Sequence, residues 1–224
     1  MIRLLNKDAR ISYSQSGEDL IVDFIFRALN IDQPTYLDIG AHHPSYINNT
    51  YFFYKKGGTG VCIEPDPILF KKIKNSRKRD QNINVGIGVD VQNKANFYIL
   101  SSKTLNTFSQ KEAERYQAFG NQKIEKIINI SLVPINEVIQ KYFKKCPNFI
   151  SLDVEGLDFE IIKTFNFNEN RPEVFCIETL TYTENKTEEK RWDIINFMIS
   201  NGYMVYADTF INTIFVNSES WRSR

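Results

Sequence analysis

Two short apolar runs, each ending in a residue suited to ligand binding, constrain the fold most strongly. The run 36–39 ends at Gly40, and the run 61–63 ends at Glu64, 24 positions after the glycine. In an open α/β sheet, ligands bind at the carboxyl ends of the strands, where a glycine turn lets the backbone approach the ligand and an acid on the next strand accepts hydrogen bonds from a ribose. The spacing therefore predicts a Rossmann-like sheet with a nucleoside site.

The residues after Gly40 indicate which nucleoside is bound. A dinucleotide site needs further glycines so that the backbone can approach a pyrophosphate, and the next four residues, Ala-His-His-Pro, supply none. An adenosine without phosphates fits better, and S-adenosylmethionine is such a ligand. A nicotinamide-dependent oxidoreductase is the disfavoured alternative.

Carboxylates follow one another along the predicted rim of the sheet. The acids at the four predicted strand ends are Asp38, Glu64, Asp153 with Glu155, and Glu178. Like charges at one rim repel each other unless a cation lies between them. A sulfonium, an ammonium or a metal would be such a cation. Asp153 and Glu178 are candidate ligands for a divalent ion, although two carboxylates alone are an unspecific metal signal and the metal is not favoured.

Five motifs occur in an order that is typical of one family. They are Tyr13–Asp19, Leu37–Pro44, Asn49–Tyr51, Cys62–Pro65 and Leu152–Gly156. In these motifs the chain resembles the FkbM family of S-adenosylmethionine-dependent methyltransferases. The resemblance covers roughly residues 12–217 and implies a class I methyltransferase fold: a mostly parallel, seven-stranded α/β sheet with helices on both faces and a C-terminal antiparallel hairpin. The chain length and the lack of a linker predict a single domain of residues 1–224. It also implies O-methylation of a hydroxyl on a sugar, a glycan precursor or a related small metabolite.

Strand ends and resemblance together give an expected cofactor site. Its residues are Gln15, Glu18, Asp38, Gly40, Ala41, Asn49, Thr50, Glu64, Pro65, Gly88, Asp153 and Glu155. Glu64 is expected at the ribose and Glu155 at the ammonium of the methionine part. Gly88 lies in a predicted strand, 82–89, where glycine lets a flat base approach or marks a bulge.

Proton removal from the acceptor hydroxyl requires a base or a metal. His43 is the leading candidate because neutral imidazole is available near pH 7 and the residue follows the glycine turn. A structural histidine packed before Pro44 is nearly as well supported. Asp153 is the second candidate base. His42 departs from the pattern of the family, where many members have a small polar residue, and we expect it to face away from the acceptor.

Two helices are expected near the first strand. Ser16 and Asp19 form a variant capping box at the start of an amphipathic helix, and the segment 12–35 is expected to cap the cofactor site. A second helix, 51–56, is expected to be capped by Asn49 or Thr50, with free N–H groups that could hold the carboxylate of the cofactor.

A polar stretch, 101–126, interrupts the alternation of strands and helices. Insertions of this kind are often binding loops or lids. Because it mixes Thr107, Phe108 and Tyr116 with charged residues, we expect a substrate lid that controls acceptor choice.

Composition excludes several other classes. The net charge is +1, and the basic residues between 71 and 79 have no interleaved aromatic residues, so they predict a solvated helix face and no nucleic-acid partner. No apolar run reaches the ~20 residues of a membrane span, and the first ten residues lack the core of a signal peptide. An odd count of three cysteines argues against a disulfide framework.

The expected location is the cytoplasm, and the expected partner is a small-molecule or carbohydrate acceptor. A binding protein that has lost turnover is the alternative function, and the oligomeric state is left open.

Overall fold

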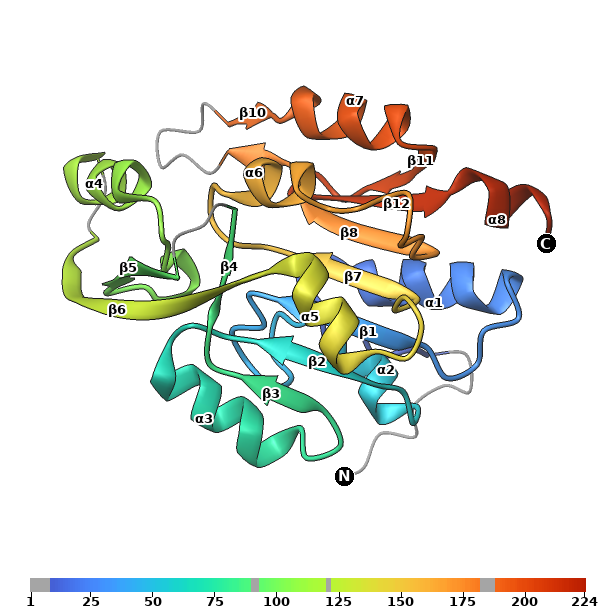
Figure 1. The fold of residues 1–224 in the computed structure, drawn as a ribbon, viewed down its shortest axis with the longest axis horizontal. Helices are drawn as coiled ribbons and strands as arrows, with labels where there is room; N and C mark the ends of the chain where they lie inside the picture. Colours follow the sequence, from blue (N-terminus) through green and yellow to red (C-terminus); the bar gives the residue numbers. More distant parts are fainter. Residues whose placement is uncertain (1–8, 90–92, 120–121, 182–187) are drawn as a thin grey trace.

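The computed structural model describes residues 9–89, 93–119, 122–181 and 188–224, and Figure 1 shows their arrangement. The strands of the main sheet are β1 (Thr35–Ile39), β2 (Thr59–Ile63), β3 (Gln81–Ile83), β7 (Phe149–Leu152), β8 (Val174–Glu178), β11 (Tyr203–Asp208) and β12 (Asn212–Asn217). Their order is β11-β12-β8-β7-β1-β2-β3. The pairs among β8, β7, β1, β2 and β3 are parallel, and β12 is antiparallel to both of its neighbours. The predicted fold class, with its terminal antiparallel hairpin, is confirmed.

Side chains that alternate along each strand build a core on both faces of the sheet. Leu37 and Ile39 face a cluster that includes α5 (Ile135–Tyr142), α6 (Asp158–Lys163) and α7 (Trp192–Ser200). Tyr36, between them in the sequence, faces α1 (Glu18–Ala28) and α2 (Tyr51–Lys55) on the opposite side. A third helix, α3 (Pro67–Ser76), packs Ile73 against Ala41 and Cys62. Asp38, which has the same parity as Tyr36, therefore points toward the α1, α2 and α3 side.

The helix α1 is part of this core. Its residues Val22, Ile25 and Phe26 are buried against the sheet. The predicted capping role of Ser16 is wrong, because the N-cap is Gly17, which has a left-handed φ of 93°. Ser14 acts in its place, since its hydroxyl accepts from the backbone N–H of Gly17 and of Asp19.

The cap of α2 also differs from the prediction. Oδ1 of Asn48 accepts from the backbone N–H groups of Thr50 (3.1 Å) and Tyr51 (2.7 Å). Neither the Asn49 nor the Thr50 side chain caps the helix. Because Asn48 takes these N–H groups, they are not open to a cofactor carboxylate.

The predicted strand 82–89 is broken into two pieces that belong to different sheets. Asn84 donates from Nδ2 to the carbonyl oxygens of Glu64 and Pro65, both at 2.8 Å, and the chain bends away from the main sheet there. β4 (Gly86–Gly88) then pairs with β6 (Ile124–Pro134), which also pairs with β5 (Lys94–Leu100). Between β5 and β6 lie the short 3-10 helix η1 (Lys103–Leu105) and α4 (Gln110–Phe119). The small strands β9 (Leu180–Thr181) and β10 (Glu189–Lys190) and the helix α8 (Ser218–Arg222) complete the described elements.

Arg77 contradicts the prediction of a solvated basic face. Lys71, Lys72, Lys74, Lys78 and Arg79 are exposed, but Arg77 is 0% exposed at the end of α3. Its Nε donates to Oδ2 of Asp80 at 2.8 Å, and its Nη2 donates to the Tyr36 hydroxyl and to Oγ1 of Thr50, both at 3.0 Å. The guanidinium therefore joins α3, β1 and the start of α2 through buried polar contacts.

We predict that Arg77→Met lowers the free energy of unfolding by about 3–5 kcal/mol, because it leaves the Asp80 carboxylate buried without its cation. Lys78→Met is the matched control, and its effect should stay within about 0.5 kcal/mol because Lys78 is exposed. Urea denaturation of both variants measures the difference. Equal stability of the two would show that the buried ion pair does not stabilise the fold.

Candidate active site

A cavity of about 330 Å³ opens at the carboxyl ends of β1, β2, β7 and β8. It is lined by seven of the residues expected at the site: Gln15, Gly40, Glu64, Pro65, Asp153, Glu155 and Glu178. The expected residues Glu18, Asp38, Ala41, His43, Asn49, Thr50 and Gly88 do not line it. The cavity thus lies at the carboxyl ends of the strands, as predicted, but only part of the expected site residues line it.

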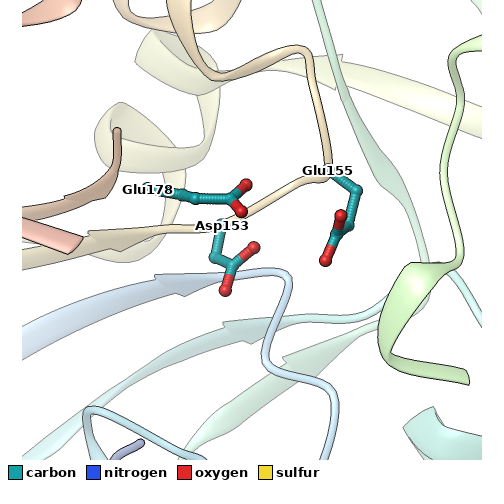
Figure 2. A group of neighbouring side chains, drawn as sticks. All are labelled: Asp153, Glu155 and Glu178. Carbon is teal, nitrogen blue, oxygen red and sulfur yellow. The ribbon is translucent and has the colours of Figure 1, made fainter. Parts of the chain in front are cut away.

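Three carboxylates from two neighbouring strand ends meet in this cavity. Asp153 and Glu155 follow β7, Glu178 ends β8, and one oxygen of each lies within 4.8 Å of the others. Figure 2 shows the three side chains gathered around one space. Burial raises the pKa of Asp153, Glu155 and Glu178, and the proximity of the other acids raises them further. This arrangement favours a cation or a proton between the carboxylates.

The loop that carries Glu155 is held from both sides. Glu155 has a left-handed φ of 54°, which is uncommon for a residue with a side chain. Its Oε2 accepts from the Tyr116 hydroxyl at 3.0 Å, and its carbonyl oxygen accepts from Oγ1 of Thr107 at 2.8 Å. Asp158 accepts from the backbone N–H groups of Val154 and Gly156. These bonds fix the acidic side chain within the cluster.

Gly40 is required by the neighbouring strand. A Cβ at this position would lie 1.8 Å from the carbonyl oxygen of Asp153, and φ of Gly40 is +80°. The backbone N–H groups of Gly40 and Ala41 both donate to the carbonyl oxygen of Ile63. The turn therefore lies tightly between the ends of β7 and β2. Ala41 itself is buried beside Cys62 and Ile73.

Glu64 is 4% exposed at the end of β2. Its carboxylate accepts from the backbone N–H of His42 at 2.8 Å and of Asp66 at 2.7 Å. Burial outweighs these bonds and raises the pKa of Glu64 to about 8. A ligand that donates hydrogen bonds to Glu64 would favour its ionised form.

Several expected cofactor residues stabilise the walls of the site. Oδ2 of Asp38 accepts from Asn48 Nδ2 at 2.9 Å and from Thr50 Oγ1 at 2.7 Å. Asn49 donates from Nδ2 to the Ser151 hydroxyl at 3.0 Å. These contacts join the loop before α2 to the central strands. Asp38, Asn49 and Thr50 therefore act on the site through the backbone that they hold.

Glu18 fastens the terminal hairpin to the N-terminal segment. Its Oε1 accepts from Oγ1 of Thr209 at 2.6 Å and from Nδ2 of Asn212 at 3.1 Å, and its Oε2 accepts from the backbone N–H of Ser16. Burial would raise the pKa of Glu18, but these hydrogen bonds hold it below its usual value. The hairpin residue Ile211 and Gln15, close in the chain to these contacts, both line the cavity.

The two histidines lie differently from our expectation, in which His43 faced the acceptor and His42 faced away. His42 lines the cavity with a left-handed φ of 52°, whereas His43 does not line it. Nδ1 of His43 accepts from the backbone N–H groups of Ser45 (3.3 Å) and Tyr46 (3.0 Å). Burial and the positive charge of Lys72 lower the pKa of His43, which keeps its ring neutral. A neutral ring that accepts at Nδ1 carries its proton on Nε2, so neither nitrogen has a free lone pair that could accept another proton.

Other lining residues had no signal in the local sequence. Leu180, Ile211 and Gln122 reach the cavity from β9, from the terminal hairpin and from the residues before β6. Such residues are found only once the strand order is known. The polar stretch 101–126, inserted between strands and helices of the core, contributes Ser102–Asn106 and Phe108.

A family model described as the methyltransferase FkbM domain matches residues 38–205, which is most of the chain. The chain belongs to the FkbM methyltransferase family. It is an S-adenosylmethionine-dependent methyltransferase, as the five motifs predict. No curated protein matches the chain.

Solved structures similar to this FkbM methyltransferase are distant. The TehB-like SAM-dependent methyltransferase of Corynebacterium glutamicum ATCC 13032 Kitasato has a TM-score of 0.44 and 10% identity, over 90% of this chain and 87% of that one. Precorrin-6y C5,15-methyltransferase of Geobacter metallireducens GS-15 has a TM-score of 0.45 and 11% identity, over 94% of this chain and 91% of that one. Magnesium protoporphyrin IX methyltransferase of Synechocystis PCC 6803, with bound SAM, has a TM-score of 0.38 and 11% identity, over 93% of this chain and 85% of that one. At these scores the fold assignment rests on the strand order and the family match alone.

The cavity of the FkbM methyltransferase suits a cationic nucleoside. It combines a carboxylate at the end of β2 with three further acids at the ends of β7 and β8. Within the described residues, no helix has both the length and the apolar character needed to cross a bilayer.

We predict that Glu64→Ala weakens binding of S-adenosylhomocysteine by about 1.5–3 kcal/mol, the usual contribution of hydrogen bonds to a charged group. Isothermal titration calorimetry measures the change. Glu169→Ala, which removes an exposed carboxylate, should leave the dissociation constant unchanged. An unchanged constant in Glu64→Ala would place the ribose elsewhere.

Proposed function

We propose that this methyltransferase transfers a methyl group to a hydroxyl of a sugar, a glycan precursor or a related small metabolite. The observation that carries the proposal is the acidic cluster of Asp153, Glu155 and Glu178, whose carboxylates line the cavity beside Gly40. An acceptor hydroxyl is a weak nucleophile until it loses its proton, and a carboxylate in the cavity can accept that proton. The sugar is the acceptor that the family resemblance implies.

S-adenosylmethionine, when bound, supplies a methyl group on a sulfonium that is open to direct displacement. The chain must hold the acceptor oxygen in line with this group, and such alignment can contribute ~7–11 kcal/mol. Glu64 is proposed to bind the ribose, and Gly40, Pro65 and Gln15 to contact the cofactor from the cavity wall. The acidic cluster is proposed to attract its positive charges, with Glu155 at the methionine ammonium.

We assign proton acceptance to Asp153 and not to His43. Asp153 lines the cavity, and no hydrogen bond to its carboxylate is found within the described residues, so its oxygens are available to an acceptor. Nδ1 of His43 accepts from two backbone N–H groups, and Nε2 carries the proton of the neutral ring, so neither nitrogen has a free lone pair for the acceptor's proton. His43 is accordingly proposed to shape the loop before α2.

A metal-assisted reaction is the second candidate mechanism. Carboxylate oxygens are hard ligands that suit Mg²⁺ or Ca²⁺, and Glu155 adds a third oxygen to the expected pair of Asp153 and Glu178. An ion there would hold the acceptor oxygen and lower the pKa of its hydroxyl. The two mechanisms differ in their response to chelators.

The acceptor is proposed to be small, and the enzyme to act in the cytoplasm without a nucleic-acid partner. The exposed lysines and arginine of residues 71–79 lie on α3 and at its end, and none of them lines the cavity. All three cysteines are free, which suits a reducing compartment.

We expect the enzyme to add 14 Da to an acceptor within a panel of sugars, nucleotide sugars and other hydroxylated metabolites, with S-adenosylhomocysteine formed in equal amount. Mass spectrometry of both products checks this. Tight binding of S-adenosylhomocysteine without product across the panel and in cell extract would favour a binding protein that has lost turnover.

Asp153→Asn should lower kcat by roughly 10²–10⁴-fold, the range for loss of a general base. The wild-type rate should fall as the pH falls through the pKa of Asp153, which burial raises to about 6, because only the ionised carboxylate accepts a proton. This acidic limb should be absent in Asp153→Asn.

His43→Gln is the matched variant and should keep most of the activity, because glutamine can still accept from the backbone. A loss of activity as large as that of Asp153→Asn would show that His43, and not Asp153, is the general base. EDTA should have little effect, whereas full inactivation that Mg²⁺ restores would establish the metal-assisted mechanism.

A further inference from the structure

We infer that the inserted segment 102–108 closes the adenosine end of the cavity, so that Phe108 and its neighbours hold the adenine base and not the methyl acceptor. The inference rests on S-adenosylmethionine as the cofactor. It does not depend on the identity of the acceptor.

The strand order gives the direction in which the cofactor lies. The polar groups of the cavity follow the order of the strands: Glu178 on β8, Asp153 after β7, Gly40 after β1 and Glu64 after β2. The cationic part of the cofactor is attracted to the acids at β8 and β7, and its ribose is bound at β2. Because adenine is attached to the ribose on the side away from the sulfonium, it extends past β2 toward β3.

Apolar side chains from two elements line the cavity near the end of β2. Next to Glu64 in the chain or in the sheet, the lining includes Pro65 and Leu69 at the start of α3, and Val85 and Ile87 after β3. The faces of a flat base suit these apolar side chains, and the polar lining residues Ser102, Thr104 and Asn106 can pair with its polar edge. We therefore place the base at this end.

The inserted segment covers this apolar end. Asn106 donates from Nδ2 to Oδ2 of Asp66 at 3.2 Å, two residues after Glu64. The ring of Phe108 lies against Gly86, where a Cβ would be 2.3 Å from its Cζ, and its centroid is 4.7 Å from that of Phe97. The lack of a side chain at Gly86 therefore leaves room for the ring of Phe108, which itself lines the cavity.

A second set of contacts holds the segment on the opposite wall of the cavity. Oγ1 of Thr107 donates to the carbonyl oxygen of Glu155, and from α4, which follows the segment, the Tyr116 hydroxyl donates to the Glu155 carboxylate. The segment is thus bonded to the loops after β2 and after β7, the two loops between which the nucleoside must lie. Lining residues that come from other parts of the chain, such as His42, Ile47 and Ile211, remain for the acceptor.

Two ligands separate the base from the rest of the cofactor. Phe108→Ala should raise the dissociation constants of S-adenosylhomocysteine and of adenosine by the same factor, about 10- to 100-fold, as the loss of an aromatic ring that stacks on a base does. Glu155→Gln, at the other end, should weaken binding of S-adenosylhomocysteine but not of adenosine, because Glu155 is the acid proposed at the methionine ammonium. Ile127→Ala, an exposed residue of β6, is the control and should change neither.

Unchanged affinity of Phe108→Ala for both ligands would overturn the placement of the base while leaving the cofactor assignment intact. Failure of the wild-type chain to bind S-adenosylhomocysteine would overturn the cofactor assignment, and the placement with it.

Photolabelling of the wild-type enzyme tests the same point without a substitution. S-adenosylmethionine with an azide at C8 of adenine should label the tryptic peptide Thr104–Lys111, which contains Leu105, Asn106 and Phe108. Tandem mass spectrometry locates the label. Labelling confined to peptides outside the inserted segment would show that the base lies elsewhere.

Discussion

The contact between Gly40 and the backbone of Asp153 is the constraint on which the site depends. The two residues follow adjacent parallel strands, and the space between them admits no side chain. The turn after β1 therefore lies directly beside the first acid of the cluster. A larger residue at position 40 would separate these strand ends and displace the acidic cluster from the glycine turn.

A buried polar network, whose residues do not line the cavity, supports the turn. Asp38 binds Asn48 and Thr50, and Arg77 reaches Thr50 from the end of α3. Buried charges of this kind stabilise a fold only when each has its partners. The motif residues near 38 and 50 thus shape the site by holding its backbone, while Glu64, Asp153 and Glu178 line the cavity.

The sequence predicts the strand ends well because their signals are local: an apolar run, a glycine and an acid. The side-chain roles depend on contacts between distant residues. Asp38 was expected at the cofactor, but the alternation along β1 turns it toward α2. Glu18 pairs with Thr209 and Asn212, whose partnership no local pattern reveals. Arg77 looks like its solvated neighbours until the chain turns inward at the end of α3. His43 was expected to be the base because it follows the glycine turn, yet its Nδ1 accepts from the backbone of its own loop.

The position of β12 has a consequence for how the enzyme folds. This strand lies between β8 and β11, although it follows both in the chain. The edge of β8 must therefore stay open until residues 212–217 are available, and the contacts of Glu18 with the hairpin form only then. During synthesis the apolar edge of β8 is exposed for the time needed to translate the intervening segment. Closure of the cavity wall at Ile211 is thus a late event, and the cofactor meets a finished site only after the sheet has received its last strand.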